Sequence, residues 1–272
     1  MQKNHFFYPY TGNKRTELHE ISKYIPENID IVVEPFCGSC AVSFHIWTTN
    51  KDKKFILNDN NKMLQELYET IKDTEKEKHF EAKLNEALEI IRNSEDKKKE
   101  YQRFATKDTL MGWFLGHKYY SIRPFLFPQH RTGFKPVKLS DTPIYHFYKE
   151  ADITFTCKDG IDCLMEYQNN PKAYIFLDPP YLNACNNYYS NPTTDIYEYI
   201  VNGPSINKAP AYIVIVVEEN YITNLIFSDK KYFCKYYEKT YQTSKKLTRH
   251  KLVMNIQCMK LYRPVKIMTR IK

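Results

Sequence analysis

Short apolar runs alternate with amphipathic segments at the start of the chain. IDIVV (29–33) is mostly apolar and β-branched, as is typical of a strand buried on both faces, and KKFILND (53–59) has the same character. AVSFHIW (41–47) predicts a helix between these two strands. A second helix, KMLQELYETIK (62–72), places four residues on one face: Leu64, Leu67, Tyr68 and Ile71. This strand–helix–strand–helix order predicts a parallel sheet.

The pattern changes after residue 72. Residues 73–118 are charged and helical in periodicity, with one apolar stripe made of Phe80, Leu84, Leu88 and Ile91. Residues 119–145 are rich in proline, aromatic and basic residues, which predicts a loop or an irregular hairpin. Strand-like runs then return as DITFTCKD (152–159), AYIFLDPPY (173–181) and AYIVIVVEEN (211–220). The alternating segment HKLVMNIQCMKLY (250–262) predicts an antiparallel hairpin at the edge of the sheet.

Together these patterns predict an α/β fold. One mostly parallel sheet domain, with an antiparallel C-terminal edge hairpin, is interrupted by a mainly helical insert. The sheet domain takes residues 1–71 and 149–272, and the insert takes residues 72–148.

Composition is that of a globular protein and bounds the partners. Of 272 residues, 42% are hydrophobic and 26% are charged, and no apolar run approaches the ~20 residues of a membrane span. The formal net charge of +8 permits a polyanionic partner without requiring one. The chain starts without the long apolar stretch of a secretion signal, and its seven cysteines lack framework spacing. We therefore expect an intracellular, cytoplasmic protein, with the nucleus or a viral factory as alternatives.

Three carboxylates follow predicted strands: Glu34, Asp59 and Asp178. Because ligands of open parallel sheets bind at the carboxyl ends of the strands, these side chains are candidate ligand-binding residues. Asp59 lies 23 residues after Phe36. In dinucleotide-binding folds, an acid roughly 20 residues after the first turn accepts hydrogen bonds from the ribose hydroxyls. An acid at a strand end is also commonly a helix cap or simply solvated.

The segment EPFCGSCAV (34–42) has two incompatible interpretations. Cys37 and Cys40 have the spacing of a redox dithiol or of half a zinc site, whereas P-F-x-G is typical of a tight strand-to-helix turn that holds a nucleotide-like cofactor. A zinc site needs further ligands, and the sequence has no second C-x-x-C or C/H cluster, so we expect no metal. Glycine is scarce, with seven residues, so Gly38 marks backbone that requires it and the turn is favoured.

The motif DPPY (178–181) is the most specific signal in the chain. Two consecutive prolines stop the strand and hold the backbone extended without N–H donors. The Asp178 carboxylate and a proline carbonyl then remain as acceptors beside the Tyr181 ring, which suits an amino group on a flat ring. The alternative is a plain strand-terminating turn with a surface tyrosine.

On these motifs the sequence resembles the Dam-like class of DNA adenine methyltransferases, which use S-adenosylmethionine. YPYTGNKRTELHEISKYIP resembles the N-terminal cofactor segment of that class, VVEPFCGSCAV its E-P-F-x-G loop, ILNDNNKMLQELY its acidic segment, and LDPPY its catalytic motif. The similarity covers roughly residues 5–70 and 144–262, in the motif order of the class. Cys40 stands where the class often has glycine, and Gly160 stands where it usually has an aromatic residue.

The resemblance implies a Rossmann-like methyltransferase domain, a target-recognition insert and a set of site residues. The catalytic residues would be Asp178, Pro179, Pro180 and Tyr181. The cofactor-binding residues would be Tyr10, Gly12, Lys14, Glu34, Phe36, Gly38, Asp59, Asp159 and Asp178. The implied reaction is methyl transfer from S-adenosylmethionine to the N6 amine of an adenine flipped out of the duplex, with S-adenosylhomocysteine as product and no metal.

Basic residues of the insert and the C-terminal region are candidate DNA contacts: Arg123, Arg131, Lys135, Lys138, Lys246 and Arg249. Cations can meet phosphates or guanine edges, and the interleaved aromatic residues can stack beside a displaced base; the alternative is a packed insert with a solvated basic face. We expect double-stranded DNA as partner, no membrane, a monomer or weak homodimer, and a cognate restriction enzyme as a further candidate. Three other functions stay open: transfer to cytosine N4, transfer to RNA adenine, and DNA binding without catalysis.

Overall fold

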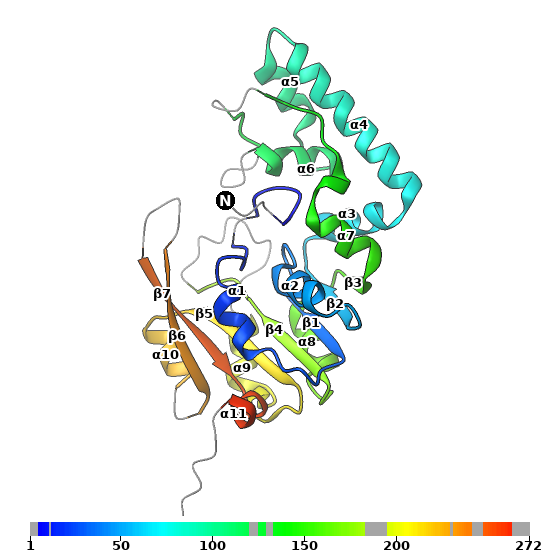
Figure 1. Ribbon diagram of the computed structural model, residues 1–272. Helices are drawn as coiled ribbons and strands as arrows, with labels where there is room; N and C mark the ends of the chain where they lie inside the picture. Colours follow the sequence, from blue (N-terminus) through cyan, green and yellow to red (C-terminus); the bar gives the residue numbers. More distant parts are fainter. Residues whose placement is uncertain are drawn as a thin grey trace, which may run out of the picture.

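The computed structural model describes residues 5–10, 12–119, 125–128, 133–182, 195–228, 231–240 and 247–262. In these ranges the backbone builds one seven-stranded sheet in the order β3-β2-β1-β4-β5-β7-β6 (Figure 1). The strands are β1 (Ile31–Glu34), β2 (Lys54–Asn58), β3 (Asp152–Thr156), β4 (Ala173–Leu177), β5 (Tyr212–Glu218), β6 (Phe233–Thr240) and β7 (Leu247–Met254).

The strand order reverses at the centre of the sheet, between β1 and β4. β1 pairs in parallel with β2 on one side and with β4 on the other. The pairs β2–β3 and β4–β5 are also parallel, whereas β7 pairs antiparallel with both β5 and β6. The predicted mostly parallel sheet with an antiparallel C-terminal hairpin is therefore confirmed. In open α/β sheets ligands bind beyond the carboxyl ends of the strands at such a reversal.

The C-terminal hairpin differs in detail from the prediction. It consists of β6 and β7, with β6 at the edge, and residues 256–262, which we predicted to extend the hairpin, form helix α11 (Ile256–Tyr262) instead. Asn255 gives the physical reason. Its buried side chain accepts a hydrogen bond from the Cys258 backbone N–H at 3.3 Å, which caps the start of the helix, and donates to the Ala211 carbonyl at 2.8 Å.

Both faces of the sheet are buried, because successive strand residues point to opposite sides. One apolar cluster contains Val32 of β1, and the other contains its neighbour Val33. Helices α1 (Leu18–Ile21), α2 (Ala41–Thr49), α3 (Lys62–Lys72), α7 (Pro143–Glu150) and α11 contribute to the first cluster. Helices α8 (Gly160–Tyr167) and α9 (Asp195–Asn202) contribute to the second, close to α10 (Tyr221–Ile226). This double cover explains why the strand sequences are continuously apolar.

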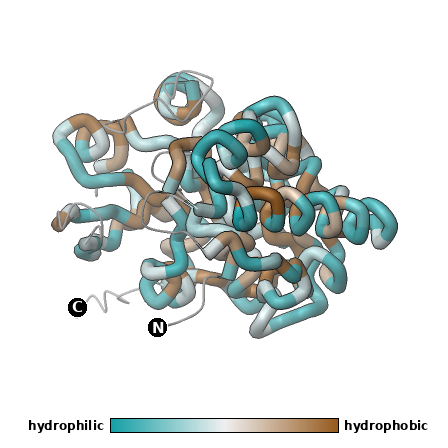
Figure 2. The backbone as a smooth tube through the Cα atoms, turned by 90° about the horizontal axis from the view of Figure 1, so that it is seen from above, coloured by the Kyte–Doolittle hydropathy of each residue, from teal (hydrophilic) through white to brown (hydrophobic). Residues whose placement is uncertain are grey.

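Three helices of the predicted insert gather at the end of the molecule that lies away from the β6–β7 hairpin (Figure 1): α4 (Thr74–Asn93), α5 (Lys97–Phe104) and α6 (Leu110–Tyr119). The stripe predicted on α4 is buried, as expected. Seen from above, hydrophobic positions gather toward the middle of the molecule and the outlying turns are mostly hydrophilic (Figure 2). Short 3-10 turns complete the described elements: η1 (Ser22–Tyr24), η2 (Leu139–Asp141) and η4 (Ile206–Lys208).

Helix α7 runs across the predicted boundary between insert and sheet domain, and its Phe147 packs against Phe55 of β2 with ring centroids 5.0 Å apart. The division at residues 71/72 and 148/149 stays a prediction. Within the described ranges, no helix has the length and apolar character needed to cross a membrane.

Candidate active site

The three predicted carboxylates all lie at the carboxyl ends of parallel strands. Glu34 is the last residue of β1, Asp59 follows β2, and Asp178 follows β4. Because β1 and β4 are the strands between which the order reverses, Glu34 and Asp178 flank the reversal itself. The sequence therefore placed these side chains at the correct edge of the sheet.

The loop after β1 is a tight turn that needs unusual backbone angles. Gly38 has a φ of 48° and Cys40 has a φ of 54°, both in the left-handed region, and α2 begins directly after Cys40. A Cβ on Gly38 would lie 2.9 Å from the Tyr10 ring, so the ring of the N-terminal segment rests against this glycine. A non-glycine residue in this conformation costs roughly 1–2 kcal/mol, which Cys40 tolerates here.

The two thiols of this loop are buried rather than poised for chemistry. Cys37 and Cys40 are both free and less than a tenth exposed, and burial raises the pKa of the Cys37 thiol. A raised pKa leaves little of the thiolate that redox and metal chemistry require. In the described part of the chain, no group of three or more His, Cys, Asp or Glu side chains could hold a metal ion. These observations favour the turn over the dithiol.

Asp59 ties the turn to the next strand. Its carboxylate accepts a hydrogen bond from the Gly38 N–H at 2.9 Å and another from the Asn61 N–H at 3.0 Å. Burial raises the pKa of Asp59, and these two backbone donors act to lower it. The two hydrogen bonds fix the orientation of this partly buried carboxylate beside the β1 turn.

Asn58, which the sequence analysis did not single out, organises the surrounding loops. It is fully buried, and its side-chain amide donates to the carbonyls of Pro35 at 2.9 Å and Lys158 at 3.0 Å. It also accepts from the Thr156 hydroxyl at 2.7 Å. One side chain thus joins the ends of three neighbouring strands; the signal in the sequence was a polar residue at the end of the apolar run, directly before Asp59.

Phe36 packs against the start of α8, where the chain departs from the motif of the class. A Cβ on Gly160 would lie 2.4 Å from Cζ of Phe36, so only glycine leaves room for this ring. The neighbouring Asp159 is exposed and caps α8 by accepting from the Ile161 N–H at 2.7 Å. A cofactor role for Asp159 therefore stays a prediction.

Asp178 and Lys14 form an ion pair at the centre of the site. Lys14 is 4% exposed, donates to the Gly12 carbonyl at 3.1 Å, and lies 5.4 Å from the centroid of the Tyr181 ring. Burial raises the pKa of Asp178, and the Lys14 ammonium acts to lower it. The structure thus brings Lys14 next to Asp178 and Tyr181, which follow it by more than 160 residues in the sequence.

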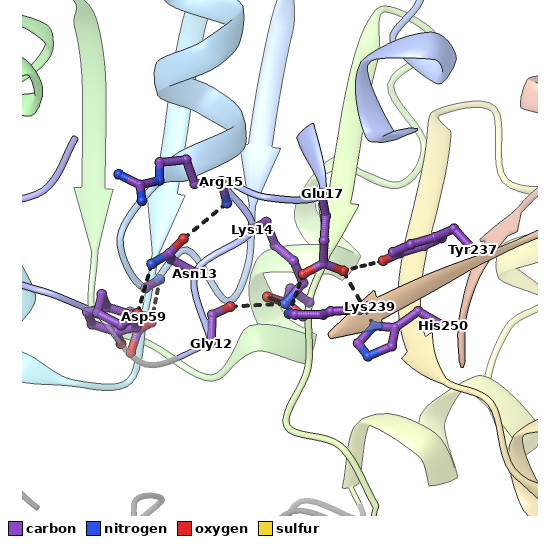
Figure 3. Close-up of polar contacts among 12 residues, drawn as sticks. Gly12, Asn13, Lys14, Arg15, Glu17, Asp59, Tyr237, Lys239 and His250 are labelled. Atoms are coloured by element: carbon purple, nitrogen blue, oxygen red, sulfur yellow. Dashed lines mark hydrogen bonds and ion pairs between the residues drawn. The ribbon is translucent and has the colours of Figure 1, made fainter. Parts of the chain in front are cut away.

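A second buried carboxylate, Glu17, was missed by the sequence analysis. It is 2% exposed and contacts Tyr237 and Lys239 of β6, and its Oε2 lies 3.4 Å from Nδ1 of His250 in β7 (Figure 3). Burial by itself would raise the pKa of Glu17, but Lys14 and these partners hold it well below its usual range. Nothing in the local sequence distinguishes Glu17 from a solvated helix-start acid.

Glu34 lies inside the fold. It is 3% exposed, and its Oε1 accepts from the Ser43 N–H of α2 at 2.6 Å. Burial raises its pKa to about 7, while the hydrogen bond from Ser43 acts in the opposite direction. The side chain therefore fixes the start of α2 against β1.

The two prolines after Asp178 present their carbonyls differently. The Tyr197 hydroxyl of α9 donates to the Pro180 carbonyl at 3.4 Å. Within the described ranges, no hydrogen bond reaches the Pro179 carbonyl. Tyr181 lies edge-on to His250, with ring centroids 5.4 Å apart.

Three of the six candidate DNA contacts lie in described segments. Lys135 and Lys138 are exposed on either side of Val137 in an extended segment. Arg249 of β7 forms an ion pair with Glu219 at 3.3 Å and lies over Tyr236. Arg123, Arg131 and Lys246 lie outside the described residues.

The family model and the curated relative agree with these motifs. Residues 10–115 match the family model of the D12 class N6 adenine-specific DNA methyltransferase, a stretch that includes the N-terminal segment and the loops after β1 and β2. The Type II methyltransferase M.CviBI of Paramecium bursaria Chlorella virus NC1A is 23% identical over 191 residues, which are 66% of this chain and 70% of that protein. The precorrin-6y C5,15-methyltransferase of Geobacter metallireducens GS-15 aligns with 93% of this chain and 95% of its own, at 9% identity and a TM-score of 0.42. The resemblance predicted from the motifs is confirmed.

Proposed function

We propose that this chain is an adenine-specific DNA methyltransferase of the D12 class, and that it moves a methyl group from S-adenosylmethionine to the exocyclic N6 amine of an adenine flipped out of double-stranded DNA. The carrying observation is the position of Asp178 and the Pro179 carbonyl at the end of β4, directly beside the β1 turn. A substrate amine held there lies next to the loop that the class uses for its cofactor.

The residues at the β1 turn fit such a cofactor. The left-handed Gly38 lets the backbone and the Tyr10 ring approach each other, and the Asp59 carboxylate is oriented by two backbone donors. Asp59 would accept hydrogen bonds from the ribose hydroxyls of the cofactor, and Phe36 would form a wall of its pocket. When bound, S-adenosylmethionine supplies an electrophilic methyl group and leaves as S-adenosylhomocysteine.

The Asp178 carboxylate and the Pro179 carbonyl would each accept a hydrogen bond from one of the two N–H groups of the adenine amine. The nitrogen lone pair is delocalised into the ring, and two acceptors held out of the ring plane favour the tetrahedral geometry that localises it. The Asp178 carboxylate also stabilises the positive charge that develops on nitrogen. The contribution is positioning and electrostatics rather than a general base with a matched pKa.

Tyr181 would stack on the flipped base. Its ring lies directly after the two prolines and is held edge-on by His250. Enzymes that react with a base inside a duplex must extrude it, and aromatic stacking offsets part of the unstacking cost.

The insert would hold the DNA. Phe134 is fully buried and anchors the extended segment that carries Lys135 and Lys138, while Asn85 of α4 exchanges hydrogen bonds with the Val137 backbone at 2.6 and 2.9 Å. The segment that carries the two exposed lysines is thus hydrogen-bonded to α4, and phosphate contacts from these lysines would orient the protein on the duplex. Because a relative is a Type II methyltransferase, we extend the proposal to a cognate restriction enzyme.

The test is transfer of labelled methyl groups from S-adenosylmethionine to unmethylated genomic DNA. Asp178→Asn should lower kcat at least ~100-fold, because an amide cannot replace the charge that stabilises the developing positive nitrogen. Asp162→Asn, an exposed position of α8, is the matched control and should keep wild-type activity. A folded Asp178→Asn protein with wild-type turnover would contradict the proposed role.

A further inference from the structure

Glu17 joins the start of the chain to its C-terminal hairpin. Its carboxylate accepts hydrogen bonds from Tyr237 and Lys239 of β6 and faces His250 of β7. None of these side chains is exposed. Figure 3 shows these side chains gathered with Lys14 and Gly12 in one cluster. The site thus holds a second buried carboxylate that the proposed reaction does not use.

The carboxylates of Asp178 and Glu17 both lie in the electrostatic field of the Lys14 ammonium. Lys14 is ion-paired with Asp178, and its positive charge also acts to lower the pKa of Glu17. Lys239, which contacts Glu17, acts electrostatically on Asp178 as well. The charges of Lys14, Lys239, Asp178 and Glu17 therefore influence one another as one set.

The ion pair poses a difficulty for the reaction. Lys14 is paired with Oδ2 of the carboxylate that must accept a hydrogen bond from the adenine amine. The ammonium offsets part of the negative charge of this carboxylate, so pairing with Lys14 weakens Asp178 as an acceptor for the incoming N–H groups. Removing the ammonium from all carboxylates inside the fold would be costly, because a buried charge needs a partner.

We propose that Glu17 is a positioning residue that gives the Lys14 ammonium a second carboxylate, so that Asp178 can turn to the adenine amine without leaving Lys14 unpaired. This role rests on the proposed methyl transfer. Tyr237, Lys239 and His250 hold the Glu17 carboxylate in place and keep it ionised. The C-terminal hairpin thereby contributes to catalysis through Glu17, without touching the substrate.

Stability alone does not account for this cluster. Buried ion pairs are often no more stabilising than apolar side chains of similar volume, because desolvation offsets the attraction. The exposed pair Glu20–Lys23, one helical turn further along, is a surface contact at 2.7 Å and provides a contrast within the same short segment.

The proposed role has a signature in the pH profile. Burial raises the pKa of Asp178, and the negative charge of Glu17 raises it further, so Glu17→Gln should lower that pKa. The acid limb of kcat/KM should then move to lower pH although the enzyme is slower. The titratable and charged groups that act on Asp178 or contact the cluster are Lys14, Glu17, Glu34, Tyr197, Tyr237, Lys239 and His250.

The experiment compares wild type, Glu17→Gln and Glu20→Gln in steady-state methyl transfer from S-adenosylmethionine to genomic DNA, from pH 5 to 9, with melting temperatures. Glu17→Gln should lower kcat about 10- to 100-fold, the effect of one lost charged hydrogen bond. KM for DNA should stay unchanged, and the acid limb should shift to lower pH. Glu20→Gln should match wild type in all three.

Each other outcome overturns the role. Wild-type kcat with an unmoved acid limb does so, and so does a loss of kcat that only follows a lower melting temperature. If Glu17→Gln does not fold, Glu17→Gln/Lys239→Met removes one carboxylate and one ammonium together; kcat must still be low, and wild-type kcat refutes the role. A wild-type protein that transfers no methyl group overturns the proposed function itself.

Discussion

Gly160→Ala tests whether Phe36 forms a wall of the cofactor pocket. The added Cβ would lie 2.4 Å from Cζ and 2.5 Å from Cε1 of the Phe36 ring. Carbon atoms in contact stay roughly 3.5–4.0 Å apart, so the ring must move by about 1 Å. Gly160 is the first residue of α8 and is buried.

The expected energies separate folding from binding. Overpacking costs about 1–3 kcal/mol, and alanine in place of glycine in a helix returns at most ~1 kcal/mol, so the protein should remain folded. A ~1 Å displacement of a pocket wall should affect ligand binding more strongly than folding. We expect the dissociation constant to increase about tenfold, which corresponds to ~1.4 kcal/mol of binding free energy.

The assay is calorimetric titration of S-adenosylhomocysteine into wild type, Gly160→Ala, Phe36→Leu and the double variant. In the double variant the ring is gone, so the alanine should add little to the effect of Phe36→Leu, and the cycle should show a clear coupling energy. Gly133→Ala, at an exposed glycine with open space around it, is the control. Unchanged binding by folded Gly160→Ala, or additive effects in the cycle, would refute the packing argument.

Three further predictions concern pH, backbone strain and salt. Burial raises the pKa of Glu34 from its ordinary value of 4.5 to about 7, so its stabilising contribution is complete below pH 4.5 and is lost as pH rises through 7. Glu34→Gln should therefore unfold like wild type near pH 4 and be more stable by up to ~3 kcal/mol at pH 8, measured in denaturant. Gly38→Ala should destabilise the fold by more than Gly12→Ala, because both glycines have positive φ but only Gly38 is packed against a ring; melting curves measure the difference, on top of ~1–2 kcal/mol of strain each. Lys135→Ala should weaken DNA binding and reduce the salt slope by ~1, whereas Lys172→Ala, at an exposed position before the amino end of β4, should not.

Each has a clear contrary result. A constant stability difference between Glu34→Gln and wild type across this pH range would mean that the carboxyl does not change charge there. Equal melting temperatures for Gly38→Ala and Gly12→Ala would show that the contact between Gly38 and the Tyr10 ring does not contribute to the destabilisation. A loss of DNA binding by Lys135→Ala that varies with sequence would indicate a base contact instead of a phosphate contact.

The sheet could be predicted because its strands are buried on both faces, which leaves uninterrupted apolar runs such as AYIFL before Asp178. Strand β6 gave no such signal, because as an edge strand it has no fully buried residue. Alternation of apolar and polar residues predicts a strand through residue 262, but the chain forms helix α11 from Ile256; Asn255 before it is a residue type that caps helices and marks the boundary.

The site was predictable as far as its motifs extend. Asp59 and Asp178 follow strands, so the sheet brings them to one edge. Glu17 and Lys239 meet across most of the chain, and no local pattern connects an acid before a short helix with a lysine in an edge strand. Such pairings depend on the order of strands in the sheet, which becomes visible only in the folded structure.

The most direct test of the central claim is to identify the methylated nucleoside. Unmethylated genomic DNA is incubated with the protein and S-adenosylmethionine, digested, and analysed by mass spectrometry, with RNA treated in parallel and Asp178→Asn as the inactive control. The account predicts N6-methyldeoxyadenosine from the wild type alone. Methylated cytosine only, methylation of RNA only, or equal product from Asp178→Asn would contradict it.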